Sequence, residues 1–210
     1  MDVWITRKSD GYEAMLTDSH NSIGTPYLAF SITSPEYYFF SKSFTTPTGA
    51  SVNSNWGIGV RSEVYKFDLN HQTLAQNKNY TPENIGTSVT GMMSYVAPMM
   101  MARFHFDSNS EYVAAHIPNS IGVGLGYAKG LIRMSGNATF GPGRNTTGIT
   151  TKSDVGVSTD TAKGVVFVIE GEHAKKYLWG FELGVMNYQT GQYTYQLSGA
   201  NFYFSYFFRL

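Results

Sequence analysis

The 210-residue chain contains no cysteine and few charged residues. The absence of cysteine excludes disulfides, zinc–thiolate sites and thiol nucleophiles. Charged side chains make up 14% of the chain, well below the roughly 25% of ordinary soluble proteins. The 15 basic residues balance the 15 acidic ones. Because phosphate binding depends on clustered lysine and arginine, this composition argues against nucleic acid as a partner.

Long apolar runs are also missing. No segment approaches the roughly 18 consecutive apolar residues of a membrane-spanning helix, and the most apolar window, Met92 to Met101, is interrupted by polar residues and by Pro98. The first residues do not read as a basic start followed by an apolar stretch, so they predict no export signal. The chain is therefore either cytosolic or a chain from which a signal peptide has been removed. Its length fits one domain covering residues 1–210.

Aromatic residues and glycine are abundant instead, with 15 Tyr, 14 Phe, 3 Trp and 22 Gly. They occur in rows with the two-residue period of a β-strand. Two segments have one wholly apolar face, made by Tyr177, Trp179, Phe181, Leu183 and Val185 in the first and by Phe202, Phe204, Tyr206, Phe208 and Leu210 in the second. The opposite face of the first segment carries glycines and a carboxylate, so its apolar row is expected to point outward.

This alternation is typical of transmembrane β-barrels, in which large apolar residues face lipid and small or polar residues face the lumen. We therefore predict an all-β fold, a closed antiparallel transmembrane barrel of about twelve strands, with eight or ten as alternatives if the loops are longer. The two rows named above are predicted to face lipid. The rival interpretation is a soluble β-sandwich that buries the same rows in its core.

The expected strands are residues 2–7, 11–17, 25–32, 35–43, 54–67, 87–96, 98–107, 119–128, 131–140, 163–171, 177–188 and 199–210. Tight turns are expected at Ala97-Pro98, at Lys129-Gly130 and at 173–176. The first of these rests on proline being unsuited to a strand interior. The polar segments 69–86, 107–118 and 141–162 are expected to be long connections at the opposite end from the turns at 129–130 and 173–176.

The closing alternation of aromatics from Phe202 to Leu210 resembles the C-terminal assembly signal of Gram-negative outer-membrane barrels, although that class usually ends in Phe. The resemblance implies a place in the bacterial outer membrane, insertion by the outer-membrane assembly machinery and a cleaved signal peptide. The expected partners are membrane lipid and lipopolysaccharide, and the expected state is a monomer. In length and strand number the chain is also similar to small twelve-stranded porins for acidic oligosaccharides, but no motif carries that similarity.

Charged residues on the faces opposite the apolar rows are predicted to line the lumen. They are Arg61, Glu63, Arg103, His105, Asp107, Glu170, Glu172 and Glu182. Two arrangements are open: a paired network, because an unpaired buried charge is costly, or a water-filled selectivity filter. The predicted function is a passive channel or porin for small solutes. The alternatives are a structural or adhesive barrel without conductance and an outer-membrane lipid hydrolase.

One cluster raises the question of catalysis: His105 is followed by Asp107, Ser108 and Glu111. A histidine near a serine and an acid can activate the hydroxyl group, and the cluster is similar in kind to the His-x-Ser motif of outer-membrane lipid A deacylases. Two residues separate His105 from Ser108 instead of one, and His105 is predicted to face the lumen. No catalytic residue is assigned, and enzymatic activity is left open.

Sites for metals and cofactors are not predicted. The other histidines are scattered without ligand spacing, and the adjacent methionines of 99–101 cannot all face one ion. The glycines at 122, 124 and 126 lack the strand–loop–helix context of a phosphate-binding loop. They are expected to be small inward residues that leave space in the lumen.

Overall fold

The computed structural model describes residues 2–17, 29–33, 36–47, 51–69, 71–76, 79–83, 88–107, 118–141, 151–173 and 177–206. The elements within these ranges are all β-strands, and every pairing between them is antiparallel, which confirms the all-β class. The described residues contain no helix able to span a membrane.

Thirteen strands form one sheet. In chain order they are β1 (Asp2–Arg7), β2 (Glu13–Thr17), β3 (Ala29–Thr33), β4 (Tyr37–Thr45), β5 (Ser51–Leu69), β6 (His71–Gln76), β7 (Asn79–Glu83), β8 (Ser88–Asp107), β9 (Ser120–Phe140), β10 (Thr151–Asp154), β11 (Val157–His173), β12 (Tyr177–Gln189) and β13 (Tyr193–Tyr206).

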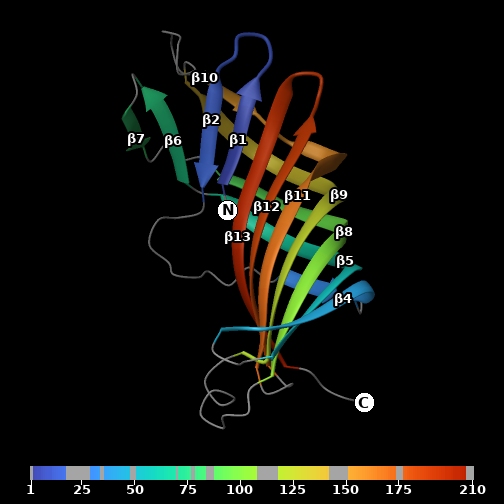
Figure 1. Ribbon diagram of the computed structural model, residues 1–210. Coiled ribbons are helices and arrows are strands. Elements are labelled where there is room, and N and C mark those ends of the chain that lie inside the picture. Colours follow the sequence, from blue (N-terminus) through green and yellow to red (C-terminus); the bar gives the residue numbers. More distant parts are fainter. Residues whose placement is uncertain are drawn as a thin grey trace.

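Most strands pair with their neighbours in the chain. The order across the sheet is β3-β5-β8-β9-β11-β12-β13-β1-β2-β6-β7, and β4 and β10 add to β5 and β9. Figure 1 shows the long strands β5 to β13 as a strongly curved sheet. We call the end with the turns at 8–12 and 190–192 the upper end, and the end with His173 and Tyr177 the lower end.

Two predicted turns are wrong, because the segments on either side of each form one strand. β8 runs through Ala97 and Pro98. The proline fits because the ladder between β8 and β9 has a gap there, passing from the pair Val96–Lys129 to the pair Met99–Gly126. β9 likewise runs through Gly130, where a Cβ would lie 1.9 Å from the Ser94 carbonyl oxygen. Glycine at this position serves close packing of two strands instead of a turn.

Other boundaries differ from the prediction as well. The segment 69–86, expected to be a long connection, contains β6 and β7, which pair with each other. β10 and the start of β11 lie inside the expected connection 141–162. The expected turn between β11 and β12 is consistent with the pairing of His173 with Tyr177. Most of the connection 107–118 lies outside the described residues.

The polarity of the sheet reverses along the length of its strands. The lower section comprises 56–64 of β5, 95–106 of β8, 120–127 of β9, 165–173 of β11, 177–185 of β12 and 200–206 of β13. The upper section comprises 65–69 of β5, 88–94 of β8, 128–140 of β9, 157–164 of β11, 186–189 of β12 and 193–199 of β13, with β1 and β2. In the upper section the buried inner face is apolar and includes Ile5, Leu16, Leu69, Met93, Ile132, Phe140, Met186, Tyr195 and Leu197. The outer face there is mainly polar, with Lys66, Asp68, Lys129, Arg133, Lys163, Asn187 and Gln196 exposed.

The lower section has the opposite arrangement. Its exposed outer face is apolar and includes Ile58, Val60, Val96, Met100, Leu125, Tyr127, Val165, Leu183, Phe202 and Phe204. Its inner face buries two arginines and three glutamates, at positions 61, 63, 103, 170 and 182. The apolar core of the fold therefore lies in the upper section, and the buried charges lie below it.

Candidate functional site

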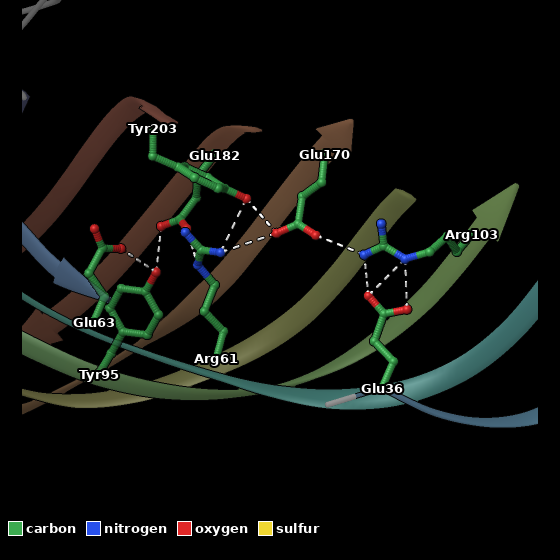
Figure 2. Close-up of polar contacts among 8 residues, drawn as sticks. All are labelled: Glu36, Arg61, Glu63, Tyr95, Arg103, Glu170, Glu182 and Tyr203. Carbon is green, nitrogen blue, oxygen red and sulfur yellow. Dashed lines mark hydrogen bonds and ion pairs between the residues drawn. The ribbon is translucent and has the colours of Figure 1, made fainter. Parts of the chain in front are cut away.

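The buried charges of the lower section form a connected polar network. Its members are Glu36, Arg61, Glu63, Tyr95, Arg103, Glu170, Glu182 and Tyr203 (Figure 2). They come from β5, β8, β11, β12 and β13, with Glu36 directly before β4. Strand alternation turns these side chains to the inner face, and their apolar neighbours in the sequence turn outward.

Arg61 connects three of the strands. Its side chain is 3% exposed and forms an ion pair with the Glu182 carboxylate through Nε. Its Nη1 lies 3.5 Å from Glu170 Oε1 and donates to the Tyr203 hydroxyl at 3.3 Å. The guanidinium also lies 4.6 Å from the centre of the Tyr203 ring, a cation–π distance. Arg61 is thus held by two carboxylates and one aromatic ring.

Arg103 is the second cationic centre. Its Nη2 lies 3.0 Å from Glu170 Oε2, and its Nε donates to both Glu36 oxygens at 3.2 and 3.0 Å. Nη2 contacts Glu36 as well, and Nη1 donates to Ser120 Oγ at 3.4 Å. Glu170 therefore bridges the two arginines, one on each carboxylate oxygen. The contact with Glu36 ties the start of β4 to β8.

A tyrosine joins Glu182 to the remaining carboxylate, Glu63. The Tyr95 hydroxyl donates to Glu63 Oε2 at 2.7 Å and also contacts Glu182 Oε1. A hydroxyl has a single proton, so one of these two contacts needs a proton held on the carboxyl side. Asn201 Nδ2 donates to the other Glu63 oxygen at 3.3 Å. The four carboxylates outnumber the two guanidiniums, and tyrosine and asparagine donors compensate in part.

Five of the eight predicted lumen residues are thus buried in one network: Arg61, Glu63, Arg103, Glu170 and Glu182. Glu172 is half-buried and reaches it through Ser120, whose Oγ lies 3.4 Å from Glu172 Oε2. His105 is half-buried on the same side of β8. The side chain of Asp107 lies outside the described residues, and so do Ser108 and Glu111, so only His105 is described of the cluster that raised the question of catalysis.

Three members of the network were not predicted from the sequence. On β8, Tyr95 is an even number of positions from Arg103, so the two side chains share a face. The same holds for Tyr203 and Asn201 on β13. Alternation alone could therefore have placed both tyrosines on the inner face. Glu36 lies within the expected strand 35–43 but was not named among the lumen residues, and in the structure it lies directly before β4.

The predicted lipid-facing residues lie on the outer face of the lower section wherever their side chains are described. Tyr177, Leu183, Phe202 and Phe204 are exposed, and Phe202 reaches 72%. Trp179, Phe181 and Val185 are half-buried. Tyr177 stacks on Phe204 with ring centres 5.7 Å apart. The side chains of Tyr206, Phe208 and Leu210 lie outside the described residues.

The glycines of β9 do not leave the inner face empty, contrary to expectation. A Cβ at Gly122 would lie 3.1 Å from the Arg103 guanidinium. Cβ atoms at Gly124 and Gly126 would lie 2.2 and 2.1 Å from the sulfur atoms of Met101 and Met99. The glycines therefore make room for long side chains of β8, which fill the inner face.

Little free space remains between the network and the apolar core above it. A cavity of about 40 Å³ lies there, bounded by Tyr95, Glu182, Met186 and Asn201 among others. A water molecule needs at least roughly 10–15 Å³ of such volume, so the cavity has room for very few. No cluster of three metal-ligating side chains occurs within the described part of the chain.

Comparisons with protein-family models, with curated proteins and with solved structures find no match for this chain. Its function must therefore be argued from its own residues.

Proposed function

We propose that this protein is a bacterial outer-membrane β-barrel whose lumen is sealed, a structural barrel that presents its upper end beyond the membrane. The reversal of polarity along the strands carries this proposal. In the lower section an exposed apolar belt surrounds buried arginines and glutamates, which is the reverse of a soluble fold. In the upper section an apolar core lies beneath a polar surface, as is typical of a soluble fold. The same strands would thus pass from lipid into water.

Strand continuity supports closure of the sheet into eight long strands. Leu69 ends β5 and His71 begins β6, so in this proposal the two are counted as parts of one long strand. β8 lies on one side of this strand and β2 on the other. The combined strand of β5 and β6 pairs on this second side with three short strands in succession. β2 pairs with it at Thr17–His71, β3 at Ala29–Tyr65, and β4 from Tyr37–Ile58 to Thr45–Ser51.

The proposed ring has eight long strands, some of them made of shorter ones. In chain order they are β1; β2 with β3 and β4; β5 with β6; β7 with β8; β9; β10 with β11; β12; and β13. In this proposal β1 joins the two halves of the ring, because β1 pairs with both β13 and β2. An even number of strands and simple neighbour connections are typical of single-chain outer-membrane barrels. Eight strands enclose an interior that side chains fill, unlike the wider interior of the twelve-stranded alternative.

The dimensions of the apolar belt fit a membrane. A tilted strand needs roughly 9–11 residues to cross a bilayer, and the belt takes nine residues in each of β5, β11 and β12 (56–64, 165–173 and 177–185). β9 has 21 residues, about twice that requirement. The remainder would extend into water, which agrees with the lysines and arginines on the upper outer face. Tyr177, Trp179 and Phe204 would lie in the aromatic girdle of the lower interface.

The filled interior favours a sealed lumen over an open pore. The network fills the lower inner face together with Met99 and Met101, which lie between Tyr95 and Arg103 on β8, and the apolar core fills the upper inner face. The passive channel predicted from the sequence is the second candidate. The excess of carboxylates over guanidiniums favours it, because an open form of such a lumen would select cations.

Two measurements test the proposal. Folded protein should change its gel mobility on heating and remain in detergent or lipid, and a monomer soluble in plain buffer would refute the membrane location. Planar-bilayer recordings of the folded protein should show no regular unitary conductance. A reproducible cation-selective conductance would favour the channel and reject the sealed lumen.

A further inference from the structure

A polar groove lies on the outer face of the upper section, away from the network. Its volume is about 470 Å³, within the roughly 300–1,000 Å³ range of small-ligand clefts. It is lined by Trp4, Thr6, Glu13, Asn187, Thr194 and Gln196. These residues come from β1, β2, β12 and β13, the strands where the two ends of the chain meet.

Strand register arranges the lining in two rows. Asn187 pairs with Gln196, and Gln196 pairs with Trp4, so one row runs from amide to amide to indole. Thr194 pairs with Thr6, and Thr6 pairs with Glu13, which gives a second row of hydroxyl groups and one carboxylate. Neighbouring strands are about 4.8 Å apart, so each row spans roughly the length of one or two sugar rings.

The chemistry of the groove fits an uncharged saccharide. Two carboxamides supply both donors and acceptors, which match neighbouring hydroxyl groups of a sugar. An indole offers an apolar face for the C–H groups of a pyranose ring, with an N–H at its edge. No lysine or arginine is among the lining residues, so the groove lacks the usual partners of a phosphate.

The position of the groove indicates where the saccharide comes from. On β12, Asn187 follows two residues after Val185, the last residue of the apolar belt, so it lies about 7 Å above the edge of the belt. The groove is in the side wall of the sheet, where a membrane barrel meets the lipids around it. A sugar attached to a lipid of that leaflet would stand at this height.

We infer that this groove binds the oligosaccharide headgroup of a glycolipid in the surrounding leaflet. The inference rests on the proposed membrane location. Trp4 would stack on a sugar ring, and Asn187 and Gln196 would bind its hydroxyl groups.

The test uses Trp4 as its own reporter. The chain has three tryptophans. A variant with both Trp56→Phe and Trp179→Phe therefore retains only Trp4. Incorporated into phospholipid nanodiscs, this variant should change its fluorescence saturably as rough lipopolysaccharide is added to the discs. Asn187→Leu with Gln196→Leu should weaken that response at least tenfold. Asn137→Leu, also exposed on the upper outer face but on β9, should leave it unchanged.

The outcomes separate the inference from the proposed function. Protein that enters nanodiscs but gives no response to lipopolysaccharide refutes the groove and leaves the barrel intact. Protein that does not enter nanodiscs refutes the membrane location itself. An equal response to the lipid-free core oligosaccharide, at the same concentration and without membrane, would show that the groove binds soluble sugar and would overturn the assignment to a glycolipid.

Discussion

Glu182 and Leu183 are consecutive residues of β12 with opposite environments: the carboxylate side chain is 3% exposed and the leucine 43%. Five residues further along the same strand the relation is reversed, because Asn187 is exposed and Tyr188 is buried. A strand in a uniform solvent keeps one polarity from end to end. β12 therefore behaves as a strand that passes between two solvents.

Replacing Phe181, at the centre of the belt on β12, by Arg tests the lower solvent directly. In lipid vesicles the change should lower the free energy of unfolding by about 2–4 kcal/mol, the cost of arginine near the bilayer midplane. Asn187→Arg, on the same face of β12 but above the belt, should cost at most about 1 kcal/mol. Urea unfolding in vesicles measures both. Equal effects of the two substitutions would contradict the position of the belt.

The network should respond strongly to a change of charge. Arg103→Glu would place a fifth carboxylate beside Glu36 and Glu170, and the free energy of unfolding should fall by about 3–5 kcal/mol, as when a buried ion pair loses one partner. Arg133→Glu, exposed on the upper outer face, should change it by less than about 0.5 kcal/mol. If Arg103→Glu folded with normal stability and altered the ion selectivity of a pore, the sealed lumen would be rejected.

The Tyr95 hydroxyl should matter as much as the charges that it joins. Tyr95→Phe removes the contacts to Glu63 and Glu182 and leaves buried acceptors without their donor, which should cost about 1–3 kcal/mol. Tyr127→Phe, on the exposed outer face of β9, is the matched control with little expected effect. A double-mutant cycle of Tyr95→Phe with Glu63→Gln should give a non-zero coupling energy. Additive effects would mean that the two groups do not interact.

Gly130 provides a test of the long strand β9, and Gly184 on β12 provides its control. Gly130→Ala would bring a Cβ within 1.9 Å of the Ser94 carbonyl oxygen, and separating the backbones of β8 and β9 should cost about 1–3 kcal/mol. Gly184 has no atom within 4 Å of a Cβ, so Gly184→Ala should be neutral or slightly stabilising. The same unfolding measurement serves both. A tolerated Gly130→Ala would argue for a turn at this point, as the sequence first suggested.

The upper turn at 8–12 should depend on pH. Hydrogen bonds from the Arg7 guanidinium, with a further one from the Tyr12 N–H, hold the pKa of Asp10 below its usual value. A depressed carboxyl pKa gives stabilisation that is present above the unfolded pKa of about 3.9 and is lost as the pH falls through the folded value. The protection of the Tyr12 amide against hydrogen exchange, relative to its intrinsic rate at each pH, should therefore decrease below about pH 4. Asp10→Asn should remove this pH dependence, and its persistence in that variant would exclude Asp10 as the cause.

Alternation predicted which residues share a face, and it brought five charged residues to one site. It could not locate the ends of the strands, since Pro98 and Gly130 are ordinary turn signals that here lie inside long strands. It also did not predict the reversal of polarity. On β9 the large apolar residues are at odd positions as far as Tyr127 and at even positions from Ile132 to Phe140. That change of parity is visible in the sequence, but its meaning depends on which face is enclosed.

The contact between Glu36 and Arg103 was not predicted from the sequence. It joins residues 67 positions apart, and Glu36 lies directly before β4, although the expected strand 35–43 included it. Only the path of the chain before β4 brings this carboxylate to the inner face.

The pairing of β1 with β13 has a consequence for how the protein folds. Asp2 is paired with Ser198, so this contact closes a loop that contains almost the whole chain. Loop-closure entropy grows with loop length, and folds dominated by such distant contacts are slow. The hairpins from β5 to β13 can form from neighbouring segments, whereas β1 can be fixed between β2 and β13 only after β13 is in place. We therefore expect the β1–β13 seam to form last during folding and to be the slowest step of assembly.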